Sequence, residues 1–275
     1  HVYRWCRRRR IPFAAYVGTA HSLDSNFKSK VMNALFAAGT LRIYKKNPVL
    51  AKTSAAKEEL RQLGVPHAVI APVGLDIAVL KKNIPADEKM RLRKEHGFEA
   101  DDVILCNVSR LSWEKRPLEL IDLFLQVKGK KKFKLIIVGN GPLEEELNEK
   151  IRKNGLEKEV KIYPNVPYEK MWEIYEMSDY YLNMNKGEIF GMAIMEAVYY
   201  KTSVAAIRAL GPSVTLKDMK GHKLCENDDE MAEWITGPYP SEKDLQESSE
   251  KMAATFTWDR CADAFLQASS EKSSR

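Results

Sequence analysis

From about residue 100 onward, short apolar runs alternate with longer stretches in which apolar residues recur at helical spacing. The runs predict buried strands and the stretches between them predict amphipathic helices. Strands are predicted at 103–108, 133–138, 160–163, 180–183 and 203–207, and helices from about 117 and at 143–153, 168–177 and 190–199. This alternation predicts an α/β fold with a parallel, doubly wound sheet. Ligands of such sheets bind at the carboxyl ends of the strands.

The first part of the chain is less regular. We expect a helix that ends near Arg10, then a strand at 11–17, a helix at 22–46, a strand at 48–52, a capped helix from Thr53 and a strand at 68–71. A strand so near the first residue needs neighbours, so we expect the chain as given to start inside a domain. A polar linker follows to about residue 100, and we place the domain boundary within 77–95. The predicted domains are an incomplete first domain at 1–85, a second domain at 95–240, and helices at 241–275 that pack back toward the first domain.

The composition is typical of a globular protein, with 44% hydrophobic and 30% charged residues in a chain of 275. No apolar run reaches the roughly 20 residues that span a bilayer, and no secretory signal follows the basic first residues. The four cysteines include no Cys-x-x-Cys pair and the five histidines no i,i+4 pair, so we expect neither a metal site nor a disulfide framework. Four scattered cysteines indicate a protein of the reducing cytoplasm.

Charge is distributed unevenly along the chain. Residues 1–95 hold 19 Lys/Arg and 7 Asp/Glu, for a net charge of +12, whereas the remainder holds 25 and 31, for −6. A basic first part indicates an anionic partner, for which nucleic acid and an anionic membrane surface are the candidates, although a solvated basic face also fits. The aromatic-and-basic pattern of a single-strand binder is missing, so we expect no nucleic acid partner.

Two glutamates eight positions apart flank an apolar run at residues 187–196, Gly-Glu-Ile-Phe-Gly-Met-Ala-Ile-Met-Glu. If Phe190 opens a helix, Glu188 lies just before it and Glu196 lies about two turns inside, near the same face. The amides of Phe190, Gly191 and Met192 would then be unpaired and would attract phosphate or sugar oxygens. A buried amphipathic helix with a solvated Glu at each end is the alternative.

Two loops that follow predicted strands carry further candidates. Arg110 and Lys115 come directly after the strand at 103–108, where two cations would stabilise a departing diphosphate. Two solvated surface cations are the alternative. Gly139-Asn140-Gly141 follows the next strand, but it lacks the third glycine of a dinucleotide fingerprint, so a nicotinamide site is improbable.

These motifs together resemble those of glycosyltransferase family 4, whose members are retaining enzymes with the GT-B fold of two Rossmann-like domains. The resemblance covers about residues 11–270 and includes the Glu-x7-Glu motif, Arg110 with Lys115, the Gly-x-Gly-Pro turn at Gly139, and Phe-Thr-Trp before the last helix. It implies that about a hundred N-terminal residues of the family's first domain are absent.

The resemblance also implies roles for individual residues. Arg110 and Lys115 would hold the diphosphate, Glu188 would bind the donor sugar, Glu196 would bind the ribose, and His21 would point toward the sugar. Further donor-binding candidates are Gly139, Val166, Tyr168, Met171, Ile189, Phe190, Gly191 and Met192. Ile189 stands where small residues are usual, Tyr199-Tyr200-Lys201 replaces the usual Ala-x-Gly turn, and residues 208–212 replace the usual glycine pair and Glu.

The function implied is metal-independent transfer of a sugar from a nucleotide-diphosphate sugar to a glycan or lipid-linked acceptor, without a cofactor. Such an enzyme would be cytoplasmic, either free or peripheral on the cytoplasmic face of the membrane. A donor-binding module without catalysis and a sugar-nucleotide epimerase remain as alternatives.

Overall fold

The computed structural model describes residues 1–18 and 27–273. The chain divides into two compact units, one made of residues 1–74 and 255–275 and the other of residues 75–254. Each unit has its own parallel sheet.

The smaller unit contains a three-stranded parallel sheet in the order β1-β2-β3. Val49, Leu60 and Val65 belong to its core and are fully buried. The Thr53 side chain accepts a hydrogen bond from the Ala56 amide and so caps the third helix, as the sequence predicted. Its elements are α1 (Val2–Arg8), β1 (Ala15–Val17), α2 (Phe27–Tyr44), β2 (Val49–Ala51), α3 (Ser54–Gln62), β3 (Val69–Ile70) and α12 (Trp258–Ser273).

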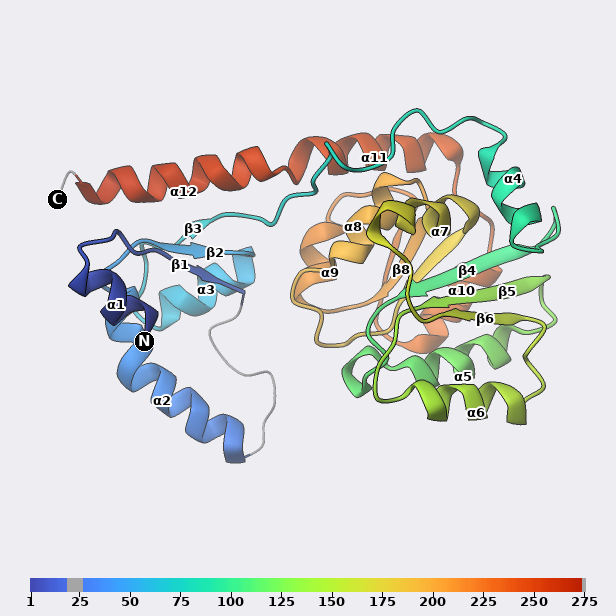
Figure 1. The fold of residues 1–275 in the computed structure, drawn as a ribbon, viewed down its shortest axis with the longest axis horizontal. Helices are drawn as coiled ribbons and strands as arrows, with labels where there is room; N and C mark the ends of the chain where they lie inside the picture. The colour runs from blue at the N-terminus through green and yellow to red at the C-terminus, as the bar shows by residue number, and fades with distance from the viewer. Residues whose placement is uncertain (19–26, 274–275) are drawn as a thin grey trace. The chain divides into compact units, whose positions relative to one another are not determined.

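The larger unit contains a six-stranded parallel sheet in the order β6-β5-β4-β7-β8-β9 (Figure 1). Its strands are β4 (Val103–Val108), β5 (Phe133–Val138), β6 (Val160–Tyr163), β7 (Tyr180–Asn183), β8 (Ser203–Ile207) and β9 (Lys223–Cys225). Its helices are α4 (Glu88–Glu95), α5 (Pro117–Val127), α6 (Glu144–Lys153), α7 (Met171–Met177), α8 (Met192–Tyr199), α9 (Leu210–Thr215), α10 (Asp228–Thr236) and α11 (Glu242–Thr255), with 3-10 turns at Trp113–Lys115 and Tyr168–Lys170.

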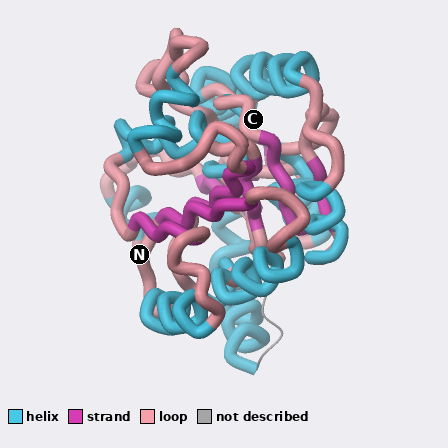
Figure 2. The backbone as a smooth tube through the Cα atoms, turned by 90° about the vertical axis from the view of Figure 1, so that its right-hand side faces the viewer, coloured by secondary structure: helices cyan, strands magenta, loops and turns pink. Residues whose placement is uncertain are grey.

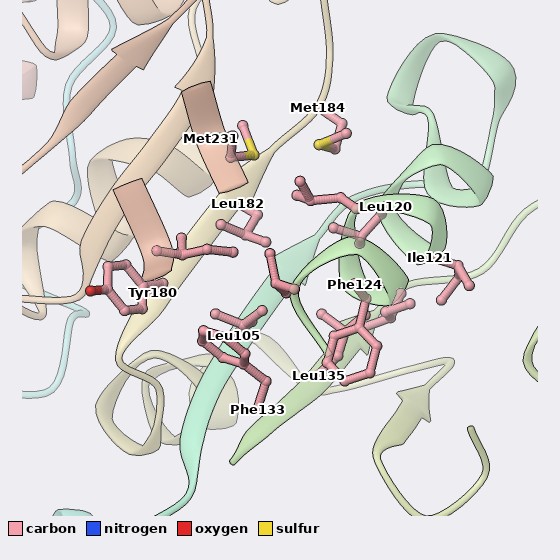
Figure 3. Close-up of a cluster of buried hydrophobic side chains, with 14 of the residues drawn as sticks. Leu105, Leu120, Ile121, Phe124, Phe133, Leu135, Tyr180, Leu182, Met184 and Met231 are labelled. Atoms are coloured by element: carbon pink, nitrogen blue, oxygen red, sulfur yellow. The ribbon is translucent and has the colours of Figure 1, made fainter. Parts of the chain in front are cut away.

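Helices cover both faces of this sheet, because its strands are apolar on both sides. Figure 2 shows the strands of the larger unit among its helices. Side chains from one face of β4, β5, β7 and β8 pack against α5, α6 and α10, as the cluster around Leu105, Leu120, Phe124, Leu135 and Leu182 shows (Figure 3). The other face meets α7 and α8. The predicted α/β class with a parallel, doubly wound sheet is confirmed.

The five strands predicted after residue 100 have the predicted bounds. The first predicted strand is shorter than expected, with only residues 15–17 paired to β2. The helix expected at 190 begins instead at Met192, because Gly191 has a φ of +90°, a left-handed conformation that cannot continue a right-handed helix. The sequence analysis missed α4, α9, β9 and α10, which are short or mostly polar.

The two units divide after Gly74 rather than within 77–95. The segment expected to be a linker contains α4, which ion pairs hold against the rest of the larger unit. Lys89 and Arg93 reach the two carboxylate oxygens of Asp179 at 2.8 and 2.6 Å. Arg93 also donates to the main-chain oxygen of Met177 at 3.0 Å, and it is buried. Of the closing helices, α11 lies in the larger unit and α12 in the smaller one.

Candidate active site

The site residues of the larger unit gather where the chain reverses its direction across the sheet. From β4 the chain proceeds to β5 and β6 on one side, then returns to β7, β8 and β9 on the other. The carboxyl ends of β4 and β7 are therefore neighbours from which the two loops diverge, which is the usual position of a ligand site in such sheets.

Lys115 and Glu188 meet at this position. The Lys115 ammonium nitrogen lies 2.9 Å from Oε2 of Glu188, although 73 residues separate them in the sequence. Their side chains are 25% and 15% exposed, so the pair is largely but not completely removed from water. Burial pushes the pKa of Glu188 upward, but hydrogen bonds and charge from Lys115, with help from Asn185, outweigh burial and leave this pKa below its ordinary value. Glu188 is therefore a carboxylate at neutral pH.

A chain of buried asparagines holds Glu188 in place. Asn185 donates from Nδ2 to Oε2 of Glu188 at 3.1 Å, and its Oδ1 accepts from the Gly187 amide at 2.9 Å. The Asn185 amide in turn donates to Oδ1 of Asn183 at 3.0 Å. These two asparagines are not among the residues predicted from the sequence. The available signal was polar Asn at the end of an otherwise apolar strand, where a buried amide must find partners.

Arg116 links its own loop to the loop after β7 and to the start of α10 by hydrogen bonds. It adopts a left-handed conformation with φ 55° directly before α5. Its guanidinium makes two hydrogen bonds to Asp228, at 3.0 and 2.8 Å, and a longer one to the main-chain oxygen of Met184. The loop that carries Lys115 is thereby fixed to the loop that carries Glu188 and to the start of α10. The sequence analysis did not single out Arg116.

Arg110 lies apart from this pair. Its side chain is 69% exposed, and it donates to Glu114 at 2.7 Å, one helical turn further on. The structure therefore brings Lys115 to Glu188 but leaves Arg110 in solvent at the same end of the sheet.

The loop between Glu188 and α8 packs against the start of α9. The Gly211 amide donates to the main-chain oxygen of Glu188 at 2.8 Å, and a Cβ on Gly211 would lie 2.4 Å from the Phe190 nitrogen. Phe190 is buried, Ile189 is half-buried and Met192 is exposed. Because α8 begins at Met192, the free helix amides start two residues later than the sequence predicted.

Glu196 is enclosed among aromatic side chains and has different neighbours from Glu188. It is 9% exposed, and the Tyr175 hydroxyl donates to its Oε2 at 2.7 Å. Burial raises the pKa of Glu196 above its ordinary value, and hydrogen bonds from Tyr175 and Tyr168 only partly oppose this effect. A small cavity opens beside it between Tyr168, Trp172 and Tyr200.

The three candidates that follow β6 lie in two different environments. Tyr168 is half-exposed and Met171 is buried, and both line the Glu196 cavity. Val166 is half-buried on the preceding loop.

Gly139 has a structural reason for its identity. Its φ is +136°, and a Cβ there would lie 1.9 Å from the main-chain oxygen of Ser109, so the β5–α6 turn packs directly on the β4 loop. The glycine lets two site loops approach each other.

His21, metal binding and membrane spanning are the remaining expectations from the sequence. His21 lies outside the described residues. Among residues 1–18 and 27–273, no cluster of three His, Cys, Asp or Glu side chains could hold a metal ion. In the same part of the chain, no helix is both long enough and apolar enough to cross a membrane.

The fold and the site together define an α/β protein that presents a carboxylate and a cation at the carboxyl edge of a doubly wound sheet. Residues 88–252 match the family described as Glycosyl transferases group 1. Because this match covers more than half of the chain, the protein belongs to that family.

Two curated relatives illustrate the family's range. The D-inositol 3-phosphate glycosyltransferase of Mycobacterium avium (strain 104) is 26% identical over 285 residues, which cover 91% of this chain and 62% of that protein. The alpha-monoglucosyldiacylglycerol synthase of Streptococcus pneumoniae is 24% identical over 139 residues, which cover 50% of this chain and 32% of that protein. The chain thus spans about three fifths of the length of the first relative.

Solved structures show the same fold. Anabaena HepE in complex with UDP and glucose has a TM-score of 0.78 at 20% identity, over 98% of this chain and 73% of that one. Sucrose-phosphate synthase from Thermosynechococcus elongatus has a TM-score of 0.77 at 16% identity, over 98% and 71%. The GT-B fold class expected from the sequence is confirmed.

Proposed function

We propose that this chain belongs to a retaining glycosyltransferase of family 4, which moves a sugar from a nucleotide-diphosphate sugar to an acceptor hydroxyl. The observation that carries the proposal is the Lys115–Glu188 ion pair, 2.9 Å long, at the carboxyl ends of β4 and β7. It supplies a cation for phosphate and a carboxylate for hydroxyl groups in one place.

The diphosphate of the donor would draw Lys115 from Glu188. Phosphate oxygens carry more negative charge than one carboxylate, and Arg110 would join Lys115 by exchanging Glu114 for phosphate. Glu188, kept ionised and held by Asn185, would then accept hydrogen bonds from the sugar hydroxyls. Glu196 would accept hydrogen bonds from the ribose, while Tyr168, Val166 and Met171 border the base.

In the reaction, the bond between the sugar's anomeric carbon and the diphosphate oxygen breaks, and the acceptor oxygen forms a new bond on the same face. The acceptor's proton passes to the departing phosphate oxygen. Lys115 and Arg110 would stabilise the charge that develops on that phosphate, so the proposal requires no metal ion or cofactor.

The acceptor is proposed to be a glycan or a lipid-linked molecule. The Streptococcus pneumoniae relative is named for a diacylglycerol product, and the Mycobacterium avium relative for an inositol phosphate. The net charge of +12 in residues 1–95 would favour an anionic membrane surface at the cytoplasmic face.

Calorimetric titration of the chain with ADP, GDP, UDP and CDP tests the donor site. We expect one nucleotide to bind selectively, and the Arg110→Ala/Lys115→Ala double variant to lose at least about tenfold in affinity, because two cations that contact the phosphates are removed. Lys153→Ala is the matched control. Lys153 lies in the last turn of α6, at the end of this helix away from the site, and it pairs with Glu149. Failure of all four nucleotides to bind would refute the proposal.

Incubation with the matching nucleotide sugars and analysis of the anomeric configuration by NMR tests the reaction. Release of sugar with retained configuration supports transfer, whereas inversion refutes the assignment to a retaining enzyme. Nucleotide binding without any turnover would instead favour the alternative function, a donor-binding module without catalysis.

A further inference from the structure

Tyr175 contacts Glu196 from a neighbouring helix and has no assigned role in the proposed reaction. Tyr175 lies on α7 and Glu196 on α8, and the phenol hydroxyl donates to Oε2 of the carboxylate at 2.7 Å. Tyr175 is 1% exposed, so water does not compete for this hydrogen bond. The contact therefore fixes one oxygen of the carboxylate, and Tyr168 supplies a further hydrogen bond to Glu196.

The Tyr175 ring is itself held from several sides. It stacks on Tyr200 with ring centroids 5.9 Å apart and an angle of 10° between the planes. It also packs against Tyr181, with centroids 6.2 Å apart. Thr202 donates to the main-chain oxygen of Tyr175 at 2.9 Å. A residue held in this way returns its hydroxyl to the same position, as a positioning group must.

The cavity beside Glu196 is closed by polar contacts from the start of the larger unit. Lys81 donates from its amide to the Tyr200 hydroxyl at 3.0 Å, and its ammonium lies 5.5 Å from the centre of the Trp172 ring. Val79, Leu80 and Lys81 therefore form one wall of the cavity, and Tyr168, Trp172 and Tyr200 form the others. These walls leave a narrow space beside the Glu196 carboxylate.

We propose that Tyr175 is a positioning residue that orients the Glu196 carboxylate toward the paired hydroxyls of a nucleotide ribose. The inference rests on the proposed function, because it assumes that a nucleotide occupies this site. Without the Tyr175 hydroxyl, Glu196 is a buried carboxylate with one fewer donor, free to rotate toward other partners. Tyr175 does not touch the sugar that is transferred, so its effect is on nucleotide affinity.

The experiment compares two ligands and five proteins by calorimetry. The ligands are whichever of ADP, GDP, UDP and CDP binds most tightly and the 2′,3′-dideoxy form of the same nucleotide, which lacks the hydroxyls that Glu196 would contact. The proteins are the unchanged chain, Tyr175→Phe, Glu196→Gln, the double variant with both changes, and Tyr180→Phe. Tyr180 is the matched control because it is equally buried, and its hydroxyl has no hydrogen-bond partner among the described residues.

We expect Tyr175→Phe to weaken binding of the ribonucleotide by roughly 10- to 150-fold, the range for a lost hydrogen bond to a charged group. The same change should alter binding of the dideoxy form less than about twofold, and Tyr180→Phe should leave both unchanged. In a Tyr175→Phe/Glu196→Gln double variant, the two losses should not add, since both act on the same contact.

Equal losses for both nucleotides in Tyr175→Phe would show a merely structural role and overturn the inference, as would full affinity in this variant. Those results leave the donor site intact. Failure of the unchanged chain to bind any of the four nucleotides would overturn the proposed function and this inference together.

Discussion

Replacing Lys115 by Met tests whether the ion pair with Glu188 holds the site together. The substitution keeps an unbranched side chain of similar length and removes the charge and its hydrogen bond. Glu188 then keeps Asn185 as its donor at 3.1 Å but loses its counter-ion at 2.9 Å. A carboxylate that is 15% exposed cannot recover this loss fully from water.

The size of the effect follows from the exposure of the two partners. Removing one partner of a fully buried pair costs about 3–5 kcal/mol, whereas an exposed pair contributes about 0–1 kcal/mol. The Lys115–Glu188 pair, with side chains 25% and 15% exposed, lies between these limits. We expect Lys115→Met to lower the free energy of unfolding of the larger unit by about 2 kcal/mol at pH 7.

The pH dependence gives a second test. Because the pKa of Glu188 in the folded protein lies below its ordinary value of 4.5, the pair stabilises the fold above that pH. This contribution is lost as the pH falls through the folded-state pKa. The difference between the two proteins should therefore be complete at pH 7 and should shrink below pH 4.5.

Urea unfolding followed by circular dichroism, for both proteins across this pH range, measures the difference. Lys150→Met is the control, since Lys150 is 26% exposed but its partner Asp122 is 59% exposed, and a loss under about 0.5 kcal/mol is expected. Equal losses for the two variants at pH 7, or a difference that does not change with pH, would refute the reasoning.

The remaining predictions concern packing, loop fixation and ligand binding. Gly139→Ala should lower the free energy of unfolding of the larger unit by about 3 kcal/mol or more, because the new Cβ would lie 1.9 Å from the Ser109 oxygen. The control is Gly129→Ala, which should cost only about 1 kcal/mol, because Gly129 has a φ of +85° but open space around it. Thermal unfolding measures both variants, and similar costs would contradict the steric explanation. Asp228→Asn should weaken the Arg116 clamp and lower nucleotide affinity by roughly 3- to 10-fold in calorimetry, and unchanged affinity would show that the clamp does not position the site. Nucleotide affinity should fall on acidification through a pH above 4.5, because burial raises the pKa of Glu196 and the protonated acid accepts hydrogen bonds less well; the fall should be missing in Glu196→Gln.

The sequence predicted the sheet of the larger unit closely, because fully buried strands are short apolar runs and the helices between them repeat with helical spacing. It failed for α4, whose eight residues include six charged ones. This helix is held by Lys89 and Arg93 against Asp179, which lies 90 and 86 residues further on, and no local pattern discloses such a partner. The same limit explains the misplaced domain boundary.

The candidate site was found in part for a similar reason. Glu188 and Lys115 could be selected because each follows a predicted strand and resembles a family motif. Asn185 and Arg116 were missed because their roles depend on side chains brought from other loops. Arg110 was expected beside Lys115, yet it extends into solvent and pairs with Glu114, which only the local geometry reveals.

The sequence by itself determined the strands β4 to β8 with the helices between them, the parallel α/β class, and that a cation and a carboxylate follow strands of one sheet. Periodicity and the chemistry of single residues are local properties, so they can be read along the chain. Only the tertiary structure decided that β4 and β7 are neighbours, that Lys115 therefore meets Glu188, and that Glu196 is buried against Tyr175. Those contacts join residues 73 and 21 positions apart, and their energies depend on burial, which exists only after the chain has packed.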